Sequence, residues 1–218
     1  MSSIVLLSGG LDSTVSLAQA LREGEVRLCI TFDYGQRAVL KEIESAEKIC
    51  RHYSIQHRVV NLPFLKAITA TSLVNQGEAV PEPGEEELDD YEKMTGTARS
   101  VWVPNRNGIF LNIAAGFAES MGADRVVTGF NAEEAKTFPD NSADYLKAAN
   151  NALAFSTLSG VRLISYTLML EKTDIIRLGR RLGAPLEYVW PCYFGEDKMC
   201  GRCESCKRYY RALKTLGD

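Results

Sequence analysis

The first sixty residues alternate between short apolar runs and longer segments in which apolar residues recur every three or four positions. The apolar runs, which predict buried strands, are 4–7, 26–32 and 59–62. The helical segments between them are 14–22 and 38–53, the second with Leu40, Ile43, Ala46, Ile49 and Cys50 on one expected buried face. Strands that alternate with helices predict a parallel sheet with right-handed crossovers.

The same alternation resumes after residue 108. It predicts helices over 109–120, 142–158 and 174–182, a strand over 124–129 and short apolar runs at 161–164 and 167–170. Thr173 is expected to cap the helix 174–182, which stops before Gly183. The sequence therefore predicts an α/β fold with a doubly wound parallel sheet. We expect a catalytic domain at residues 1–185 and a small cysteine-rich tail with a basic helix at 186–218.

One segment interrupts this pattern. Residues 82–92 contain seven acidic side chains, with two prolines and a glycine just before or among them. Such a composition is typical of a solvated surface loop. Long loops of α/β enzymes also close over active sites, so a lid remains an alternative interpretation.

Composition narrows the class of protein. Apolar residues make up 45% and charged residues 24%, which excludes a disordered chain, a collagen and a coiled coil. The net charge of −3 gives no overall basic surface for nucleic acid. No apolar run reaches membrane-spanning length, and the start of the chain lacks a secretory pattern, so we expect a cytoplasmic protein with reduced cysteines.

The first chemical signal follows the first predicted strand, where the sequence reads SGGLDST over residues 8–14. A helix that begins after a strand directs free N–H groups at bound anions, and Gly9 and Gly10 leave room for a phosphate. The motif lacks the lysine of a Walker loop. Asp12 would repel phosphate unless a cation, most simply Mg²⁺, lies between them. The alternative is a capping aspartate in a turn whose glycines serve packing.

The second signal is a group of four cysteines near the end of the chain. Cys192, Cys200, Cys203 and Cys206 have the spacing C-x7-C-x2-C-x2-C, which suits one tetrahedral ion with four thiolate ligands. We predict one structural Zn²⁺ per chain, because a site closed by four protein ligands has no open catalytic position. An iron–sulfur cluster is the alternative.

Two middle segments offer polar side chains at places where ligands bind in α/β folds. VPNRN at 103–107 precedes a helix, and GFNAEEAKTFPDN at 129–141 follows a strand. The guanidinium of Arg106 suits a carboxylate or phosphate. Amides and carboxylates such as Asn131 and Glu134 could bind the polar edge of a purine-like ring. Ordinary turns are the alternative for both segments.

SGGLDST resembles the pyrophosphate-binding loop (PP-loop) of the ATP pyrophosphatase superfamily. Together with VPNRN, GFNAEEAKTFPDN and the cysteine tail, it resembles the 7-cyano-7-deazaguanine synthase family of queuosine biosynthesis over essentially the whole chain. The sequence departs from that family's pattern at Glu134, Phe138 and Asn141, and in having Trp-Pro-Cys at 190–192.

The resemblance implies an adenine nucleotide alpha hydrolase-like fold with ATP and Mg²⁺ as cosubstrate. The implied nucleotide-binding residues are Ser8, Gly9, Gly10, Leu11, Asp12, Ser13 and Thr14, with Asp33 and Tyr34 at the end of the second strand. The implied catalytic residues are Ser8, Asp12, Ser13 and Arg106. The implied substrate-binding residues are Asn105, Arg106, Asn131, Glu134 and Asp140.

The implied reaction is that of an ATP-dependent carbon–nitrogen ligase. It would convert 7-carboxy-7-deazaguanine and free ammonia to the nitrile through an adenylated carboxylate and an amide, in a cytoplasmic homodimer without direct nucleic-acid contact. Two alternatives remain open. A PP-loop tRNA sulfur-transfer enzyme would need a reactive cysteine pair and a basic surface. A non-enzymatic zinc module would bind nucleic acid through the basic tail, which contains Arg202, Lys207, Arg208 and Arg211.

Overall fold

The core of the molecule is a five-stranded parallel sheet with the strand order β3-β2-β1-β4-β5. The computed structural model describes residues 1–217. The strands are β1 Ser2–Leu6, β2 Glu25–Asp33, β3 His57–Asn61, β4 Arg125–Thr128 and β5 Arg162–Ser165. The chain builds outward from β1 to β3, then crosses back and continues on the other side with β4 and β5. The order therefore reverses between β1 and β4, which is where doubly wound sheets bind ligands.

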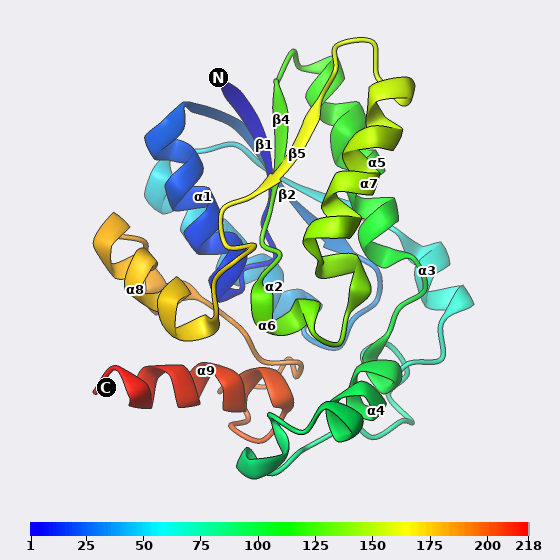
Figure 1. The fold of residues 1–218 in the computed structure, drawn as a ribbon, viewed down its shortest axis with the longest axis vertical. Helices are drawn as coiled ribbons and strands as arrows, with labels where there is room; N and C mark the ends of the chain where they lie inside the picture. Colours follow the sequence, from blue (N-terminus) through cyan, green and yellow to red (C-terminus); the bar gives the residue numbers. More distant parts are fainter. Residues whose placement is uncertain (218) are drawn as a thin grey trace.

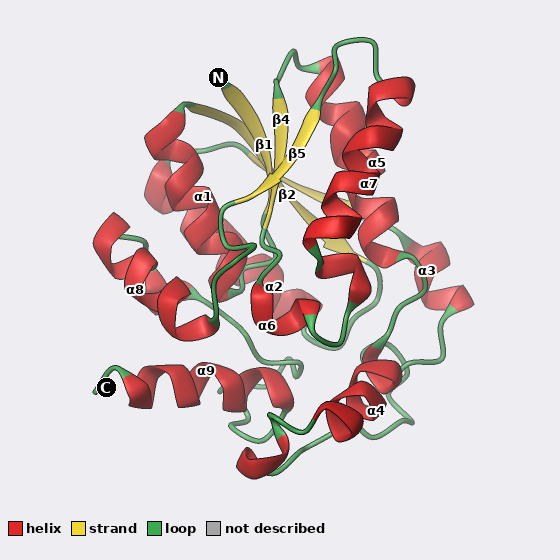
Figure 2. Cartoon of the chain, viewed as in Figure 1, coloured by secondary structure: helices red, strands yellow, loops and turns green. Residues whose placement is uncertain are grey.

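Helices cover both faces of the sheet (Figure 1). Helices α1 (Leu11–Glu23) and α2 (Val39–Tyr53) lie on one face, and α5 (Arg106–Ser120) and α7 (Ala143–Ser156) lie on the other (Figure 2). The remaining helices are α3 Pro63–Ile68, α4 Tyr91–Val101, α6 Ala132–Ala135, α8 Lys172–Leu182 and α9 Glu204–Thr215. Short 3-10 turns occur at Glu85–Glu87, Pro139–Asn141 and Leu186–Tyr188. Within residues 1–217, no helix has both the length and the apolar composition needed to cross a bilayer.

The apolar run at the start of the chain forms the central strand because both of its faces are covered. Ile4 packs into the cluster beneath α5 and α7, whereas Val5 and Leu7 pack into the cluster beneath α1 and α2. All three side chains are at most 1% exposed. A parallel strand buried on both sides requires apolar residues at successive positions, which explains the unbroken run.

The predicted fold class is confirmed, with local errors that include two unpredicted short helices, α3 and α6. Leu40 was expected on the buried face of α2 but is 78% exposed. Thr173 does not cap α8, since the helix begins at Lys172, two residues earlier than predicted, and Glu171 occupies the N-cap without a side-chain bond. Helix α4 was not predicted, because Gly96 has a low helix propensity and only Met94, Ala98 and Val101 are buried along its length.

The acidic segment at 82–92 packs against the tail. Glu82 pairs with Arg202 at 2.7 Å, and Asp89 pairs with Arg211 at 2.9 Å. The side chain of Leu88 is 2% exposed. No residue of 82–92 lines the main cavity described below. The segment is therefore a mostly exposed surface loop, as expected, but it is anchored to the tail. The lid interpretation stays a prediction.

Candidate active site

The turn between β1 and α1 is shaped by its glycines and hydroxyls. Gly9 has φ +78°, and a Cβ at this position would lie 2.7 Å from the Cβ of Ser45 on α2. Gly10 is the N-cap of α1. Its N–H donates to Ser8 Oγ at 3.3 Å, and its carbonyl accepts a bond from Thr14 Oγ1 at 2.7 Å. The turn is therefore held in a fixed shape beside the free N–H groups that begin α1.

A cavity of about 260 Å³ opens beside this turn, at the carboxyl ends of β1, β2 and β4. The predicted site residues that line it are Ser8, Gly10, Leu11, Asp12, Ser13, Tyr34, Arg106 and Glu134. The predicted site residues outside the lining are Gly9, Thr14, Asp33, Asn105, Asn131 and Asp140. The switch point of the sheet thus brings residues from four separate segments to one cavity.

Three of the predicted residues that do not line the cavity shape the backbone beside it. Asp33 Oδ1 accepts a bond from the Gly35 N–H at 3.0 Å. Asn131 caps α6, accepting from the Glu134 N–H at 3.0 Å. Asn105 begins α5 from a left-handed conformation with φ 51°. These contacts shape the rim of the cavity.

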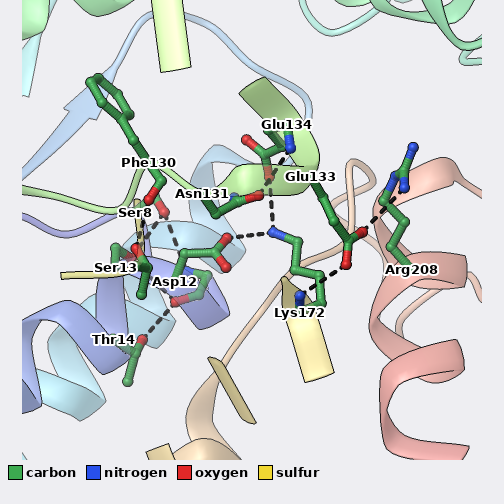
Figure 3. Close-up of polar contacts among 12 residues, drawn as sticks. Ser8, Asp12, Ser13, Thr14, Phe130, Asn131, Glu133, Glu134, Lys172 and Arg208 are labelled. Atoms are coloured by element: carbon green, nitrogen blue, oxygen red, sulfur yellow. Dashed lines mark hydrogen bonds and ion pairs between the residues drawn. The ribbon is translucent and has the colours of Figure 1, made fainter. Parts of the chain in front are cut away.

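Lys172, the first residue of α8, is the principal site residue that sequence reasoning missed. Its Nζ lies 2.5 Å from Asp12 Oδ2 and 2.9 Å from Glu134 Oε1 (Figure 3). Asp12 and Lys172 are 160 positions apart, and no spacing rule connects them. The other carboxylate oxygen of Asp12, Oδ1, is buried with no hydrogen-bond partner among the described residues. That oxygen fits a Mg²⁺ ligand, because Mg²⁺ prefers carboxylate and phosphate oxygens.

Burial and mutual charge together set the protonation states of Asp12, Lys172 and Glu134. Burial raises the pKa of the Asp12 carboxyl to about 6, although the positive charge of Lys172 acts in the opposite direction. Burial by itself would lower the pKa of Lys172, but the two adjacent carboxylates outweigh it and raise that pKa. Burial by itself would raise the pKa of Glu134. The positive charge of Lys172 and its hydrogen bond outweigh burial, so the pKa of Glu134 is lowered. Near neutral pH the cluster therefore holds one ammonium between two carboxylates.

A second set of polar groups occupies the side of the cavity next to α5. Arg106 donates a hydrogen bond from NH1 to the Tyr34 hydroxyl at 3.2 Å. Burial raises the pKa of Tyr34, so its phenol stays protonated at neutral pH. Glu42 accepts a bond from Gln36 Nε2 at 2.8 Å, and burial raises the pKa of Glu42 to about 6. Burial also raises the pKa of Asp140, which faces Arg106. Glu42 and Gln36 were not predicted.

Gly129 allows the end of β4 to approach the glycine turn. A Cβ at this position would lie 2.7 Å from the Ser13 backbone N and 3.0 Å from the Asp12 carbonyl carbon. Both are backbone atoms at the start of α1, so a side chain could not be accommodated by a rotamer change. The sequence signal was a glycine directly after a buried strand.

The four tail cysteines converge as predicted, and their ligand atoms lie within 4.8 Å of one another. Tetrahedral Zn²⁺ with Zn–S bonds of about 2.3 Å requires sulfur–sulfur distances of about 3.8 Å, so modest adjustment closes the site. Backbone N–H groups of Phe194 and Cys200 donate to Cys192 Sγ at 3.3 and 3.4 Å. Such bonds favour thiolates, so the donor set suits zinc.

The other two cysteines are remote from this chemistry. Cys29 and Cys50 are both buried, and neither lines the cavity. Their mutual hydrogen bond, reinforced by burial, raises the pKa of Cys29, which keeps the thiol protonated and unreactive. The arrangement disfavours a sulfur-transfer enzyme.

The four basic tail residues considered for nucleic-acid binding are all engaged within the protein. Arg202, Arg208 and Arg211 each pair with a carboxylate, and Lys207 donates to the Pro83 carbonyl. A nucleic-acid module needs unpaired basic groups along one face. The structure therefore gives no support to the non-enzymatic alternative.

Comparison with known proteins identifies the family. The family model described as "Queuosine biosynthesis protein QueC" matches residues 2–217. The chain belongs to this family. It is 57% identical over 217 residues to the 7-cyano-7-deazaguanine synthase of Pelotomaculum thermopropionicum, covering 100% of this chain and 98% of that protein. It is 50% identical over 220 residues to the 7-cyano-7-deazaguanine synthase of Methanosarcina mazei, covering 100% and 95%.

The resemblance inferred from the motifs is thus confirmed. A solved structure of a 4-thiouridine synthetase in an RNA complex with bound ATP matches with a TM-score of 0.49 and 19% identity. That match covers 100% of this chain and 50% of the other.

Proposed function

We propose that this protein converts 7-carboxy-7-deazaguanine and ammonia to 7-cyano-7-deazaguanine with ATP. The product is the one that its relatives' names give. One observation carries the proposal. The glycine turn at residues 8–14 opens into the same cavity as Lys172 and Arg106, so a polyphosphate and an organic carboxylate can meet there.

The chemistry starts from a poor electrophile. A carboxylate must be activated, because its oxygen is a poor leaving group. Attack of that oxygen on the α-phosphorus of ATP expels pyrophosphate and gives an acyl adenylate, which ammonia converts to the amide with release of AMP. A second adenylation, at the amide oxygen, then allows AMP to leave and the nitrile to form.

In this proposal the glycine turn is the polyphosphate site. The N–H groups at the start of α1 and the hydroxyls of Ser8 and Ser13 bind and orient the phosphate oxygens. The ammonium of Lys172 offsets the negative charge that develops on the pyrophosphate leaving group. Bound Mg²⁺, held by Asp12, would supply further charge neutralisation.

The opposite side of the cavity is proposed to bind the deazaguanine acid. Arg106 is partly buried and keeps its positive charge, so its planar guanidinium can orient the substrate carboxylate. Glu134 accepts hydrogen bonds at the same cavity. Asn131 then acts through the α6 backbone that it caps, and Tyr34 through its bond to Arg106. Asn105 and Asp140 lie beside the cavity, at the start of α5 and facing Arg106.

The tail is proposed to hold one structural Zn²⁺ through its four cysteines, because four protein ligands leave no open position. We further propose a catalytic domain at residues 1–185 with the tail at 186–218 as an appended module. A cytoplasmic location fits the four thiols that the metal requires. Assembly as a homodimer remains part of the proposal.

The decisive experiment is incubation of the purified protein with the deazaguanine acid, ATP, Mg²⁺ and ammonium, followed by mass spectrometry. We expect the nitrile, with formation that depends on ATP and on ammonium. Absence of both nitrile and amide, in a protein that binds ATP, would contradict the proposed activity.

A further inference from the structure

A continuous chain of buried charged groups connects the tail helix α9 to the glycine turn (Figure 3). Arg208 NH1 on α9 lies 3.1 Å from Glu133 Oε2 on α6. The other oxygen of Glu133 accepts a bond from the Lys172 backbone N–H at 2.9 Å. Lys172 Nζ then contacts Asp12 on α1. The side chains of Arg208, Glu133 and Lys172 are 8–10% exposed, so water competes little for these contacts.

The guanidinium of Arg208 is held from three directions. Besides Glu133, its Nε donates to Glu204 Oε1 at 2.9 Å and its NH2 donates to the Leu88 carbonyl at 3.1 Å. Glu204 is the first residue of α9 and directly follows Cys203. Glu204 of the tail and Leu88 of the acidic segment therefore fix the orientation of the Arg208 guanidinium.

Glu133 supplies the cap that α8 otherwise lacks. Lys172 is the first residue of that helix, and the preceding Glu171 makes no side-chain cap bond. The free N–H groups at a helix start require acceptors and favour a negative charge. The carboxylate of Glu133 meets both needs at Lys172, and it therefore fixes the backbone from which the lysine side chain reaches Asp12.

We infer that Arg208 and Glu133 are positioning residues through which the cysteine tail holds Lys172 against Asp12 in the nucleotide site. A buried ion pair contributes little net stability compared with apolar packing, so the value of this one is geometric. The inference rests on the proposed function to the extent that ATP binds at the glycine turn. It gives the tail a part in nucleotide binding beyond its own folding.

The test compares two variants with a matched control. Glu133→Gln keeps an acceptor for the Lys172 N–H but removes the charge that holds Arg208. Arg208→Gln removes the guanidinium that pairs with Glu133 and Glu204. The control is Arg211→Gln, on the same helix, which breaks only the surface pair with Asp89. The measurements are the ATP–Mg²⁺ dissociation constant by calorimetry, kcat and KM, thermal unfolding and bound zinc.

We expect kcat/KM for ATP to fall about 10–100-fold in Glu133→Gln and Arg208→Gln, since misplacement by about 1 Å can cost that much. Bound zinc should remain at the wild-type level in both. Arg211→Gln should stay within about twofold of wild type, as expected for an exposed pair. The double variant should be no worse than the more affected single variant, because both changes break the same connection.

The division of the loss between KM and kcat separates positioning from loss of folded protein. Lys172 contacts Asp12 at the proposed polyphosphate site, so its displacement should raise KM for ATP and the ATP dissociation constant. A smaller folded fraction would lower the apparent kcat and leave KM unchanged.

Unchanged ATP affinity and an unchanged KM for ATP in folded Glu133→Gln would overturn the inference. So would additive losses in the double variant. If Arg208→Gln does not fold, Glu133→Gln decides the question, because Arg208 then still pairs with Glu204. A wild-type protein that binds ATP but makes no nitrile would refute the proposed activity alone, and ATP affinity would still test the connection.

Discussion

Substitution of Gly129 by alanine tests whether close approach of β4 to the glycine turn is required for nucleotide binding. The added Cβ would lie 2.7 Å from the Ser13 backbone N and 3.0 Å from the Asp12 carbonyl carbon. Favourable contacts between heavy atoms begin near about 3.5 Å, so the backbone must separate by about 0.8 Å. That movement displaces the N–H groups at the start of α1, which are the proposed phosphate ligands.

The expected cost has two parts. Overpacking of this kind destabilises a protein by about 1–3 kcal/mol, which urea denaturation measures. A displacement of this size at a binding site lowers kcat/KM for ATP by about 10–100-fold. Activity should therefore suffer more than the fraction of folded protein, which stays near unity at that cost in a chain of ordinary stability.

Gly116→Ala is the matched control. Gly116 lies within α5, and a Cβ there would have no neighbour within 4 Å. Alanine at an exposed helical position stabilises by about 0.5–1 kcal/mol relative to glycine, so this variant should be more stable and equally active. If Gly129→Ala bound ATP as tightly as wild type, the phosphate site would not depend on this contact and the reasoning would be refuted.

Three further predictions use other parts of the site. Asp12→Asn should abolish ATP turnover while the fold is retained, because the asparagine side chain lacks the negative charge that pairs with Lys172. Near-normal ATP consumption by this variant would contradict the role proposed for Asp12. Cys203→Ser should lose bound zinc and the folded tail, detected by metal analysis and a lower melting temperature; full metal content with an unchanged melting temperature would contradict the zinc assignment. Glu42→Gln should raise the free energy of unfolding at pH 7 by up to about 2 kcal/mol, because burial raises the folded pKa to about 6 and penalises the ionised carboxylate. This gain should disappear as the pH falls below 4.5, the value before burial, and equal urea midpoints at pH 7 would exclude it.

The local pattern predicted most of the fold because the central strands are buried on both faces. Such strands must be apolar at successive positions, and the helices between them show a regular apolar stripe. The pattern failed where burial is partial. Leu40 has helical spacing but faces solvent, and α4 buries too few side chains for its periodicity to stand out.

The glycine turn and the four cysteines were visible in the sequence because their residues are close along the chain. The glycines and hydroxyls of the phosphate turn are adjacent in the sequence, and the four thiolates of the metal site lie between residues 192 and 206. Short spacing was thus enough to predict both features and to relate the chain to a family.

The connection of Lys172, Glu133 and Arg208 to the nucleotide site became visible only in the tertiary structure. Each is an ordinary charged residue in its own segment, and its role depends on a partner contributed by another element. These charges come together only when β4 pairs with β1, β5 pairs with β4 and the tail packs on α8. Because that arrangement minimises unpaired charge over the whole molecule, no local pattern records it.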